Sequence, residues 1–378
     1  MASNIPRSMR AVALSRHCKP SEYELATLST PEISRPDQLL IRVHAASVNP
    51  IDVKMASSLG KFMGKSKYAH LLHYAGPSVA NPPFHRFPYK FGYDLAGVVA
   101  AVGTSVSNFK PGDEVYSRIP SHCRGSLAEY ALSTASTTAL KPKTLSFSEA
   151  AAFPLAAQTA LQSLQRGEEE LKGGLKGKTV FIPGGLSGTG SFGVQLAKNV
   201  FQAGKVITTL STGKIPKIRA LLGEGTPDQI VDYTKEDVGK VVEKGSVDFM
   251  FDPVGGTLAA LPLMKKGGWI ISVSTVPSGK LMKEKMLPDL PLFLKVILDI
   301  ANWFFMTMTG WKGVNYSYLH LEGNTADLDR LAKWADEGKV RPVVGMQAKL
   351  EDIEGVRKGC QQIFDGKGGV GKFVVSMD

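Results

Sequence analysis

Apolar residues alternate with polar ones, or form short runs, through most of the first part of the chain. Two examples are the stretches 39–45 and 95–103, and a Lys-Pro-Gly-Asp turn signal follows at 110–113. Short apolar runs separated by turn residues are typical of strands. Residues 10–150 therefore predict a β-rich domain, and Met9 already lies in its first strand. A helix is predicted over 146–164, where Ser148 can cap the first turn.

The pattern changes between about residue 176 and residue 275, where short apolar strands alternate with helical segments. Such alternation predicts a doubly wound parallel sheet of the α/β class. The stretches 338–344 and 371–376 return to β character, and we expect them to rejoin the first domain. The dinucleotide-binding domain would then be inserted at 158–316, between a first part at 1–157 and a returning part at 317–378. The expected strands of the parallel sheet are 178–182, 205–210, 229–231, 247–252 and 268–274.

Two segments depart from these patterns. Residues 56–90 are rich in Tyr, His and Pro, and residues 288–311 are strongly apolar and contain Trp303, Phe304 and Phe305. The second segment is nearly long enough to cross a bilayer, but Lys295 and Asp299 interrupt it. We expect a buried or pocket-lining helix there. A membrane-surface contact or a subunit contact is the alternative.

Composition indicates a globular protein of two domains. The chain has 378 residues, of which 43% are hydrophobic, and a formal net charge of +11. The basic residues do not gather into a patch interleaved with aromatic residues, so we expect no nucleic-acid partner. The three cysteines lie far apart without metal-ligand spacing. They are interpreted as buried thiols of a cytoplasmic protein, and only about eight N-terminal residues are expected to extend beyond the first strand.

A glycine-rich stretch at 178–198 carries the strongest functional signal. A strand is followed by a turn with Gly184, Gly185, Gly188, Gly190 and Gly193, and then by the first turns of a helix. Glycines let a backbone approach a pyrophosphate, and the helix N-terminus presents N–H groups to it. The fingerprint fits in two registers: one reads Gly188-x-Gly190-x-x-Gly193, and the other has Ser187 at its centre. A turn that binds nothing is the alternative.

The residues after the second strand indicate which nucleotide is bound. NAD-specific sites usually place an acid there, whereas this chain has Ser211, Thr212 and Lys214, and the next acid is Glu224. Hydroxyl groups and cations suit a 2′-phosphate, so NADPH is the predicted cofactor. The alternative is that these lysines only form a solvated helix face.

Several motifs in order resemble those of a known family. The chain resembles the medium-chain dehydrogenase/reductase superfamily, in particular its zinc-free quinone oxidoreductase and enoyl reductase branch, from Met9 through Val375. This resemblance implies a GroES-like β-rich domain combined with a Rossmann domain. The motifs that carry it are 45–52 with Asn-Pro-x-Asp, 92–99 with Gly-x-Asp-x-Ala-Gly, 151–160 with Ala-Ala-x-Pro and Thr-Ala, 231–234, 251–256 and 371–375.

The resemblance also implies roles for individual residues. Each has a simpler alternative: Asn49 could only stabilise its turn, Tyr233 could only pack, and Lys372 could be a surface residue, while Asp252 is expected to order its own loop. The implied cofactor contacts are Asn49 and Thr159 near the nicotinamide and its ribose; Gly185, Ser187, Gly188, Thr189 and Gly190 at the pyrophosphate; Lys214 and Tyr233, with Ser211 and Thr212, at the 2′-phosphate; and Gly255, Ser274 and Lys372 on the nicotinamide side.

Departures from the family pattern indicate which kind of reaction to expect. Zinc-dependent members carry a Cys in the first catalytic loop and a Gly-His-Glu motif, where this chain has Asp52-Val53 and Gly92-Tyr93-Asp94. Without such ligands no zinc site is expected. We expect NADPH to deliver hydride to an apolar electrophilic substrate, an α,β-unsaturated carbonyl or a quinone. Asn49, Tyr93 and Tyr74 are the expected catalytic residues.

The proton donor is left open. The candidates are Tyr93 and Tyr74, with Tyr68 and His73 beside them. Two other hypotheses also remain: a non-catalytic NADPH sensor, and a membrane-peripheral scaffold with a reductase fold. A homodimer through the sheet edge near 268–275 is a further implication of the resemblance.

Overall fold

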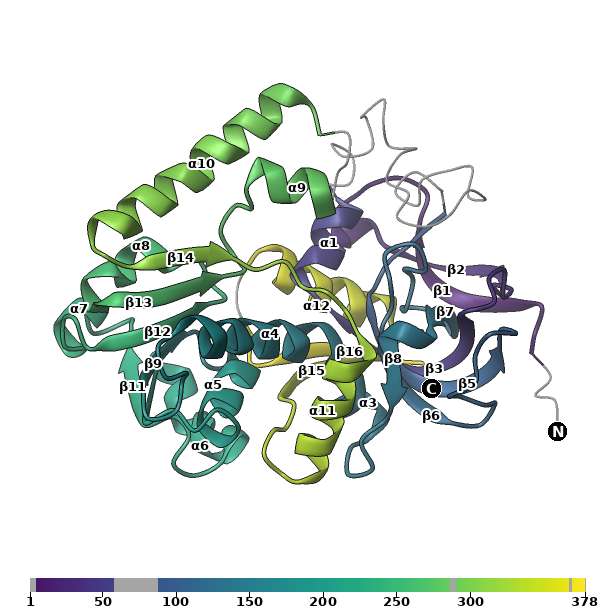
Figure 1. Cartoon of the computed structure of the whole chain (residues 1–378). Coiled ribbons are helices and arrows are strands. Elements are labelled where there is room, and N and C mark those ends of the chain that lie inside the picture. Colours follow the sequence, from purple (N-terminus) through teal and green to yellow (C-terminus); the bar gives the residue numbers. More distant parts are fainter. Residues whose placement is uncertain (1–4, 58–87, 286–289, 367–368, 378) are drawn as a thin grey trace. The chain divides into compact units, whose positions relative to one another are not determined.

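The computed structural model describes residues 5–57, 88–285, 290–366 and 369–377. The chain divides into two units (Figure 1). Unit 1 contains residues up to 158, 323–338 and 342–378, and unit 2 contains 159–322 and 339–341. The sequence-based expectation placed 317–322 in the returning part, whereas these residues belong to unit 2. The segment 58–87, with Tyr68, His73 and Tyr74, lies outside the described residues.

Unit 1 is the β-rich unit that the alternating pattern predicts. Strand β3 (Gln38–Val48) pairs antiparallel with β5 (Asp94–Val102), β7 (Tyr130–Thr134) and β16 (Lys372–Ser376). Its main sheet has the order β15-β16-β3-β5-β6-β8, and a smaller sheet has the order β2-β1-β4. The remaining strands are β1 (Ser8–Leu14), β2 (Glu24–Ser29), β4 (Tyr89–Lys90), β6 (Glu114–Arg118), β8 (Thr138–Leu140) and β15 (Val344–Lys349).

Of the two strands expected in the returning C-terminal segment, one forms where it was predicted and the other begins later. Strand β16 pairs with β3, so the C-terminal residues do complete the first sheet. The predicted strand at 338–344 is displaced, because β15 begins only at Val344. Pro342 has no N–H to donate to a strand ladder, which accounts for the late start. The helices of this unit are α1 (Pro50–Ala56), α3 (Phe147–Ala151), α11 (Thr325–Asp336) and α12 (Ile353–Phe364).

The single helix expected over 146–164 is two helices in the structure. Helix α3 ends at Ala151, and α4 (Pro154–Glu170) begins at the proline. Proline disfavours the helical conformation of the residue before it and is well placed in the first turn of a helix. The first helix is capped by Ser146, whose hydroxyl accepts the Glu149 N–H at 3.3 Å, rather than by Ser148. The boundary between the units falls inside α4, after Gln158.

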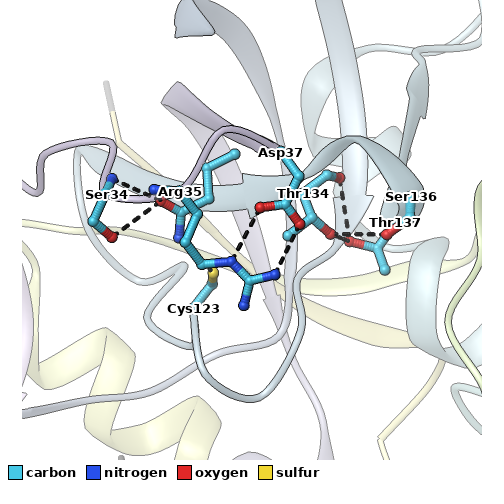
Figure 2. Close-up of polar contacts among 8 residues, drawn as sticks. Ser34, Arg35, Asp37, Cys123, Thr134, Ser136 and Thr137 are labelled. Carbon is cyan, nitrogen blue, oxygen red and sulfur yellow. Dashed lines mark hydrogen bonds and ion pairs between the residues drawn. The ribbon is translucent and has the colours of Figure 1, made fainter. Parts of the chain in front are cut away.

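A polar network holds the chain where it enters β3, and Figure 2 shows it. The Gln38 side-chain oxygen accepts the N–H groups of Ser34 and Arg35 at 2.9 and 3.0 Å, and its amide nitrogen lies 3.7 Å from the Cys123 sulfur. The Arg35 guanidinium pairs with Asp37 at 3.0 Å. Burial raises the pKa of the Cys123 thiol to about 11, as expected of a structural thiol.

Unit 2 is a parallel sheet with the strand order β11-β10-β9-β12-β13-β14. This is the order of a Rossmann sheet, in which successive strands are added to one side of β9 and then, from β12 on, to the other side. Helices α5 and α6 lie on one side of the sheet and α8 and α10 on the other (Figure 1), as right-handed crossovers require. The strands are β9 (Thr179–Pro183), β10 (Lys205–Leu210), β11 (Gln229–Asp232), β12 (Val247–Asp252), β13 (Met264–Ser272) and β14 (Asn315–Tyr318).

The edge of this sheet differs from the expectation. Strand β13 pairs with β12 on one side and with β14 on the other, so residues 268–272 are internal to the described sheet. The short strand β14, which the sequence pattern did not predict, takes the edge. The helices that connect the strands are α5 (Gly190–Asn199), α6 (Ile215–Leu222), α7 (Val238–Val241), α8 (Thr257–Ala260), α9 (Gly279–Lys285) and α10 (Leu292–Trp311).

Helix α10 is the second departure in this unit. It was expected to be buried or to line a pocket, and the structure contradicts the first of these: 6% of its most apolar window is buried. By length and composition alone the helix could cross a membrane. One narrow side packs on the sheet, and the opposite side is exposed.

Candidate active site

Three strand ends bring a buried polar cluster together in unit 1. Asn49 follows β3, Asp94 begins β5 and Lys372 begins β16. Since β3 pairs antiparallel with both of the other strands, its end meets both of their beginnings: Ser47 faces Asp94, and Val48 faces Phe373. The exposed fractions are 2% for Asn49, 0% for Asp94 and 5% for Lys372, so the surface alternative for Lys372 is wrong.

The Asp94 carboxylate is the centre of this cluster. One of its oxygens accepts the Asn49 amide N–H at 2.8 Å and the Ser47 hydroxyl at 3.1 Å. The same oxygen lies 3.6 Å from the Lys372 ammonium nitrogen. Its other oxygen accepts the Leu155 backbone N–H at 2.9 Å, at the start of α4. A buried carboxylate is therefore satisfied on both oxygens.

Lys372 and Asp94 together fix the orientation of the Asn49 amide. The Lys372 ammonium donates to the Asn49 side-chain oxygen and to the Val48 carbonyl, the latter at 3.3 Å. The oxygen of the amide therefore faces the cation, and its nitrogen faces the anion. An amide nitrogen carries two N–H groups, and Asp94 takes one of them; the described residues supply no acceptor for the other, which could therefore donate to a ligand.

The charges in the cluster depend on one another. Burial raises the pKa of Asp94, and Lys372, Asn49, the Leu155 N–H and Ser47 oppose this rise. Burial lowers the pKa of Lys372, and Asp94 opposes that shift. Each group is thus held in its charged form mainly by the other, as is usual for a buried ion pair.

Asp52 is a second buried carboxyl next to this cluster. One oxygen accepts the Asn49 backbone N–H at 2.7 Å, and within the described residues the other has no hydrogen-bond partner. Burial raises the pKa of Asp52 to about 7. Between pH 3.8 and about 7, the Asp52 carboxyl is therefore protonated in the folded chain and ionised in the unfolded chain. The contribution of Asp52 to stability falls as the pH rises through this window.

We expect Asp52→Asn to remove this pH dependence. The amide still accepts the Asn49 N–H but does not titrate. The difference in free energy of unfolding between the two proteins should change by up to about 1.4 kcal/mol per pH unit across the window. Urea denaturation at a series of pH values measures it. Parallel stability curves for the two proteins would contradict the assigned shift.

The glycine-rich turn lies between β9 and α5 in unit 2. The Ser187 N–H donates to the Gly184 carbonyl at 2.7 Å, and the Ser187 hydroxyl accepts the Gly190 N–H at 3.0 Å. A Cβ at Gly190 would lie 2.3 Å from the Gly184 oxygen, and one at Gly185 would lie 2.3 Å from the Thr208 hydroxyl. The turn is thus closed to side chains at both positions and presents bare backbone at a helix N-terminus, which fits a pyrophosphate.

The next loop gathers hydroxyl groups and a cation, together with an acid that the sequence pattern did not place there. Ser211 follows β10, and Thr212 and Lys214 form the short 3-10 helix Thr212–Lys214. The Thr212 hydroxyl donates to Asp232 at 2.6 Å, and the Thr234 hydroxyl does so at 2.6 Å. These hydrogen bonds hold the pKa of Asp232 below its usual value. The parallel pairing of β10 with β11, which places Leu210 beside Asp232, is the signal that could have revealed this contact.

The loop after β12 is ordered by Asp252, which confirms the sequence-based prediction. One carboxylate oxygen accepts the N–H groups of Val254, Gly255 and Gly256 at 2.8–3.2 Å. The Ser274 hydroxyl donates to the Asp252 carbonyl at 3.1 Å. Gly255, Ser274 and this loop therefore form one rigid edge at the carboxyl end of the sheet, where α/β domains bind ligands.

The remaining predicted residues have different surroundings. Thr159 lies in α4 and is 7% exposed, whereas the Tyr233 side chain is 57% exposed and does not pack beside the sheet. Tyr93 is buried, and the Arg118 guanidinium lies 5.2 Å from its ring centre. Tyr74 lies outside the described residues. Within residues 5–57, 88–285, 290–366 and 369–377, no three His, Cys, Asp or Glu side chains could hold a metal ion together.

Comparison with known sequences identifies the family. Residues 35–143 match the alcohol dehydrogenase GroES-like domain, and residues 227–374 match the zinc-binding dehydrogenase family. With the two-unit fold and the strand order above, the chain belongs to the medium-chain dehydrogenase/reductase superfamily.

Individual relatives are similar over different shares of the chain. The 2-methylene-furan-3-one reductase of Solanum lycopersicum is 37% identical over 275 residues, which are 71% of this chain and 63% of that enzyme. The trans-enoyl reductase pgmF of Aspergillus terreus is 29% identical over 396 residues, covering 100% of this chain and 99% of its own. The quinone oxidoreductase of Coxiella burnetii has a solved structure with a TM-score of 0.75 and 28% identity, covering 98% of this chain and 100% of its own.

Proposed function

We propose that this protein is an NADPH-dependent reductase that transfers hydride to an α,β-unsaturated carbonyl or a quinone without zinc. The observation that carries the proposal is the Asn49 amide, held in one orientation by the buried Asp94–Lys372 pair. By the family resemblance, Asp52 and Asp94 fall in the two motifs in which zinc-dependent members carry their Cys and Gly-His-Glu residues. The names of the tomato and Aspergillus relatives, a 2-methylene-furan-3-one reductase and a trans-enoyl reductase, support the substrate class.

The residues fit the chemistry of such a reduction. A nicotinamide cofactor supplies the hydride when it is bound. An unsaturated carbonyl polarises its own double bond, so the protein has only to orient the acceptor and stabilise the developing negative charge. The second Asn49 N–H can donate to a cofactor or substrate oxygen, and Lys372 raises the positive potential around it. Gly185, Ser187 and Gly190 would hold the pyrophosphate, and Gly255 and Ser274 would border the nicotinamide.

NADPH rather than NADH is proposed because of the residues after β10. Lys214 and the Ser211 hydroxyl belong to the loop directly after β10, where a 2′-phosphate would bind. Among the described residues, Asp232 is the one acid hydrogen-bonded to this loop, and its oxygens accept the Thr212 and Thr234 hydroxyls. The carboxylate therefore orders the loop, and a ribose hydroxyl would have to compete with these donors for it.

Replacing Lys214 by Ala should raise the KM for NADPH about tenfold and leave the KM for NADH nearly unchanged, because only NADPH carries the 2′-phosphate. Initial rates with both cofactors measure the two effects. Lys217→Ala, an exposed lysine three residues further along, is the matched control and should change either KM less than about threefold. An equal loss with both cofactors would argue against a 2′-phosphate contact.

The proposal itself is tested by NADPH fluorescence titration, followed by consumption assays with an enone, a crotonyl thioester and a 1,4-quinone. Both are performed after dialysis against a chelator. Binding and turnover on one of these classes would support a metal-independent reductase. Tight binding without turnover would favour a sensor, and restoration of activity only by added zinc would contradict the metal-free mechanism.

A further inference from the structure

The outward side of α10 is an apolar stripe. Its residues recur every three or four positions, which places them on one face of the helix. The exposed fractions are 67% for Phe293, 64% for Trp303 and 79% for Trp311, and monomeric proteins seldom expose so many large apolar side chains together. The stripe consists of Phe293, Val296, Ile297, Ile300, Trp303, Phe304 and Trp311.

The inward side of the helix fixes it to unit 2. Phe305 and Met308 pack against the apolar core of the sheet, and the Phe305 ring stacks on Tyr316 with 5.6 Å between ring centres. The two charged residues of the helix, Lys295 and Asp299, pair with each other at 2.6 Å. Because α10 joins the neighbouring parallel strands β13 and β14, it lies along the surface of the unit rather than across a membrane (Figure 1).

A basic depression adjoins the C-terminal end of the stripe. Lys312 follows Trp311 directly. The Gly267 N–H donates to the Gly313 carbonyl at 2.7 Å, and this hydrogen bond holds the chain next to Lys266 beside the chain next to Lys312. Of its lysines, Lys265 pairs with Asp248 at 2.9 Å. The depression is lined by Lys244, Gly245, Leu261, Pro262, Met264, Lys265, Lys266 and Lys312.

We propose that α10 and the basic depression form a docking surface for an anionic lipid bilayer. The apolar stripe would enter the boundary between headgroups and acyl chains, with the helix parallel to the membrane plane. The lysines of the depression would bind lipid phosphates. Trp, Phe and aliphatic residues on one face with cations beside them are the composition of interfacial helices. Each lysine near an anionic surface strengthens such binding several-fold.

The charges favour a lipid surface over a second copy of the chain. In a symmetric dimer both copies contribute the same patch, so a second copy brings more lysines of its own and no opposite surface charge to match them. An anionic surface neutralises them instead. The overall formal charge of +11 acts in the same direction. The proposal is independent of the reductase activity.

The test is flotation of the full chain with vesicles of phosphatidylcholine, with and without about one third phosphatidylserine. The wild-type protein should float with the anionic vesicles. The stripe variant Ile300→Ser with Trp303→Ser and the charge variant Lys266→Glu with Lys312→Glu should each lose about tenfold or more of the bound fraction. Phe305 is left intact because it supports the core.

Matched controls separate docking from general effects. Leu140→Ser removes a 56% exposed leucine of unit 1, and Lys205→Glu reverses an exposed lysine at the start of β10. Both should float like the wild type, and all variants should keep the wild-type melting temperature within a few degrees. Trp emission should also be quenched by lipids brominated near the headgroups, and this quenching should be lost in Trp303→Phe with Trp311→Phe.

Three results would overturn the proposal. Wild-type protein that fails to float with the anionic vesicles would do so, as would full binding by both variants. The third result is a wild-type protein that is a dimer and a stripe variant that is a monomer, with neither of them binding vesicles. The stripe would then be an interface between two copies of the chain. Sedimentation in parallel with flotation distinguishes these results.

Discussion

Asp94→Asn is expected to lower the free energy of unfolding by about 3–5 kcal/mol, because it leaves the Lys372 ammonium buried without its counter-charge. The side chain keeps its size, so the loss reports the charge rather than packing. The Asn49 amide also loses the acceptor that fixes its orientation, and turnover should fall about tenfold or more even under conditions where the variant is folded. Urea denaturation at neutral pH gives the first quantity, and initial rates well below the unfolding transition give the second.

A double-mutant cycle measures the interaction energy between Asp94 and Lys372 separately from the cost of changing either residue alone. Lys372→Met alone should also destabilise the protein, whereas Asp94→Asn combined with Lys372→Met should cost less than the sum of the two changes. The matched control is Asp37→Asn, which breaks the Arg35–Asp37 pair of Figure 2, in which the aspartate side chain is 41% exposed. It should cost less than about 1 kcal/mol. Additive effects at positions 94 and 372 would contradict the proposed coupling.

Gly190→Ala is the second change with a large expected effect. Its Cβ would lie 2.3 Å from the Gly184 backbone oxygen, a separation that the turn can relieve only by opening. Opening moves the Ser187 hydroxyl away from the Gly190 N–H and displaces the helix N-terminus from its place beside the turn. We expect the Kd for NADPH to rise about a hundredfold, and some stability to be lost as well. Fluorescence titration measures the Kd.

Gly310→Ala provides the control for this substitution. Gly310 lies in α10, and an added Cβ there meets no atom within 4 Å. The change should leave NADPH binding unaffected and, because alanine favours helices, should stabilise the protein slightly. Unchanged NADPH affinity in a folded Gly190→Ala protein would show that the turn does not bind the pyrophosphate.

The sequence was most informative about the parallel sheet. Strands β9, β10 and β12 fall within a residue of their predicted positions, since buried strands of such sheets are continuous apolar runs between turn signals. Strand β14 was missed because Asn-Tyr-Ser-Tyr is short and polar, as an edge strand can be. The apolar stretch 288–311 also indicated a helix, but not which of its faces the fold would cover. That outcome depends on Phe305 and Met308 meeting the sheet core.

The candidate site was predictable only in part. The resemblance pointed to Asn49 and Lys372, but the way they meet could not be seen, because they are separated by 323 residues in the sequence. Asp94 was noted only as part of a motif, although it is the acceptor that joins them. Its contact with Asn49 depends on the antiparallel pairing of β3 with β5, which a single sequence does not specify. Asp232 was missed at the adenosine loop for the same reason.

The most direct test of the account is to follow the hydride itself. The chelator-treated protein would be incubated with NADPH deuterated at the transferring carbon and with an α,β-unsaturated ketone, and the product would be analysed by mass spectrometry and NMR. Hydride transfer without a metal should give a saturated ketone with deuterium at the β-carbon, and the reaction should need no added metal. An allylic alcohol with deuterium at the former carbonyl carbon, formed only when zinc is supplied, would contradict it.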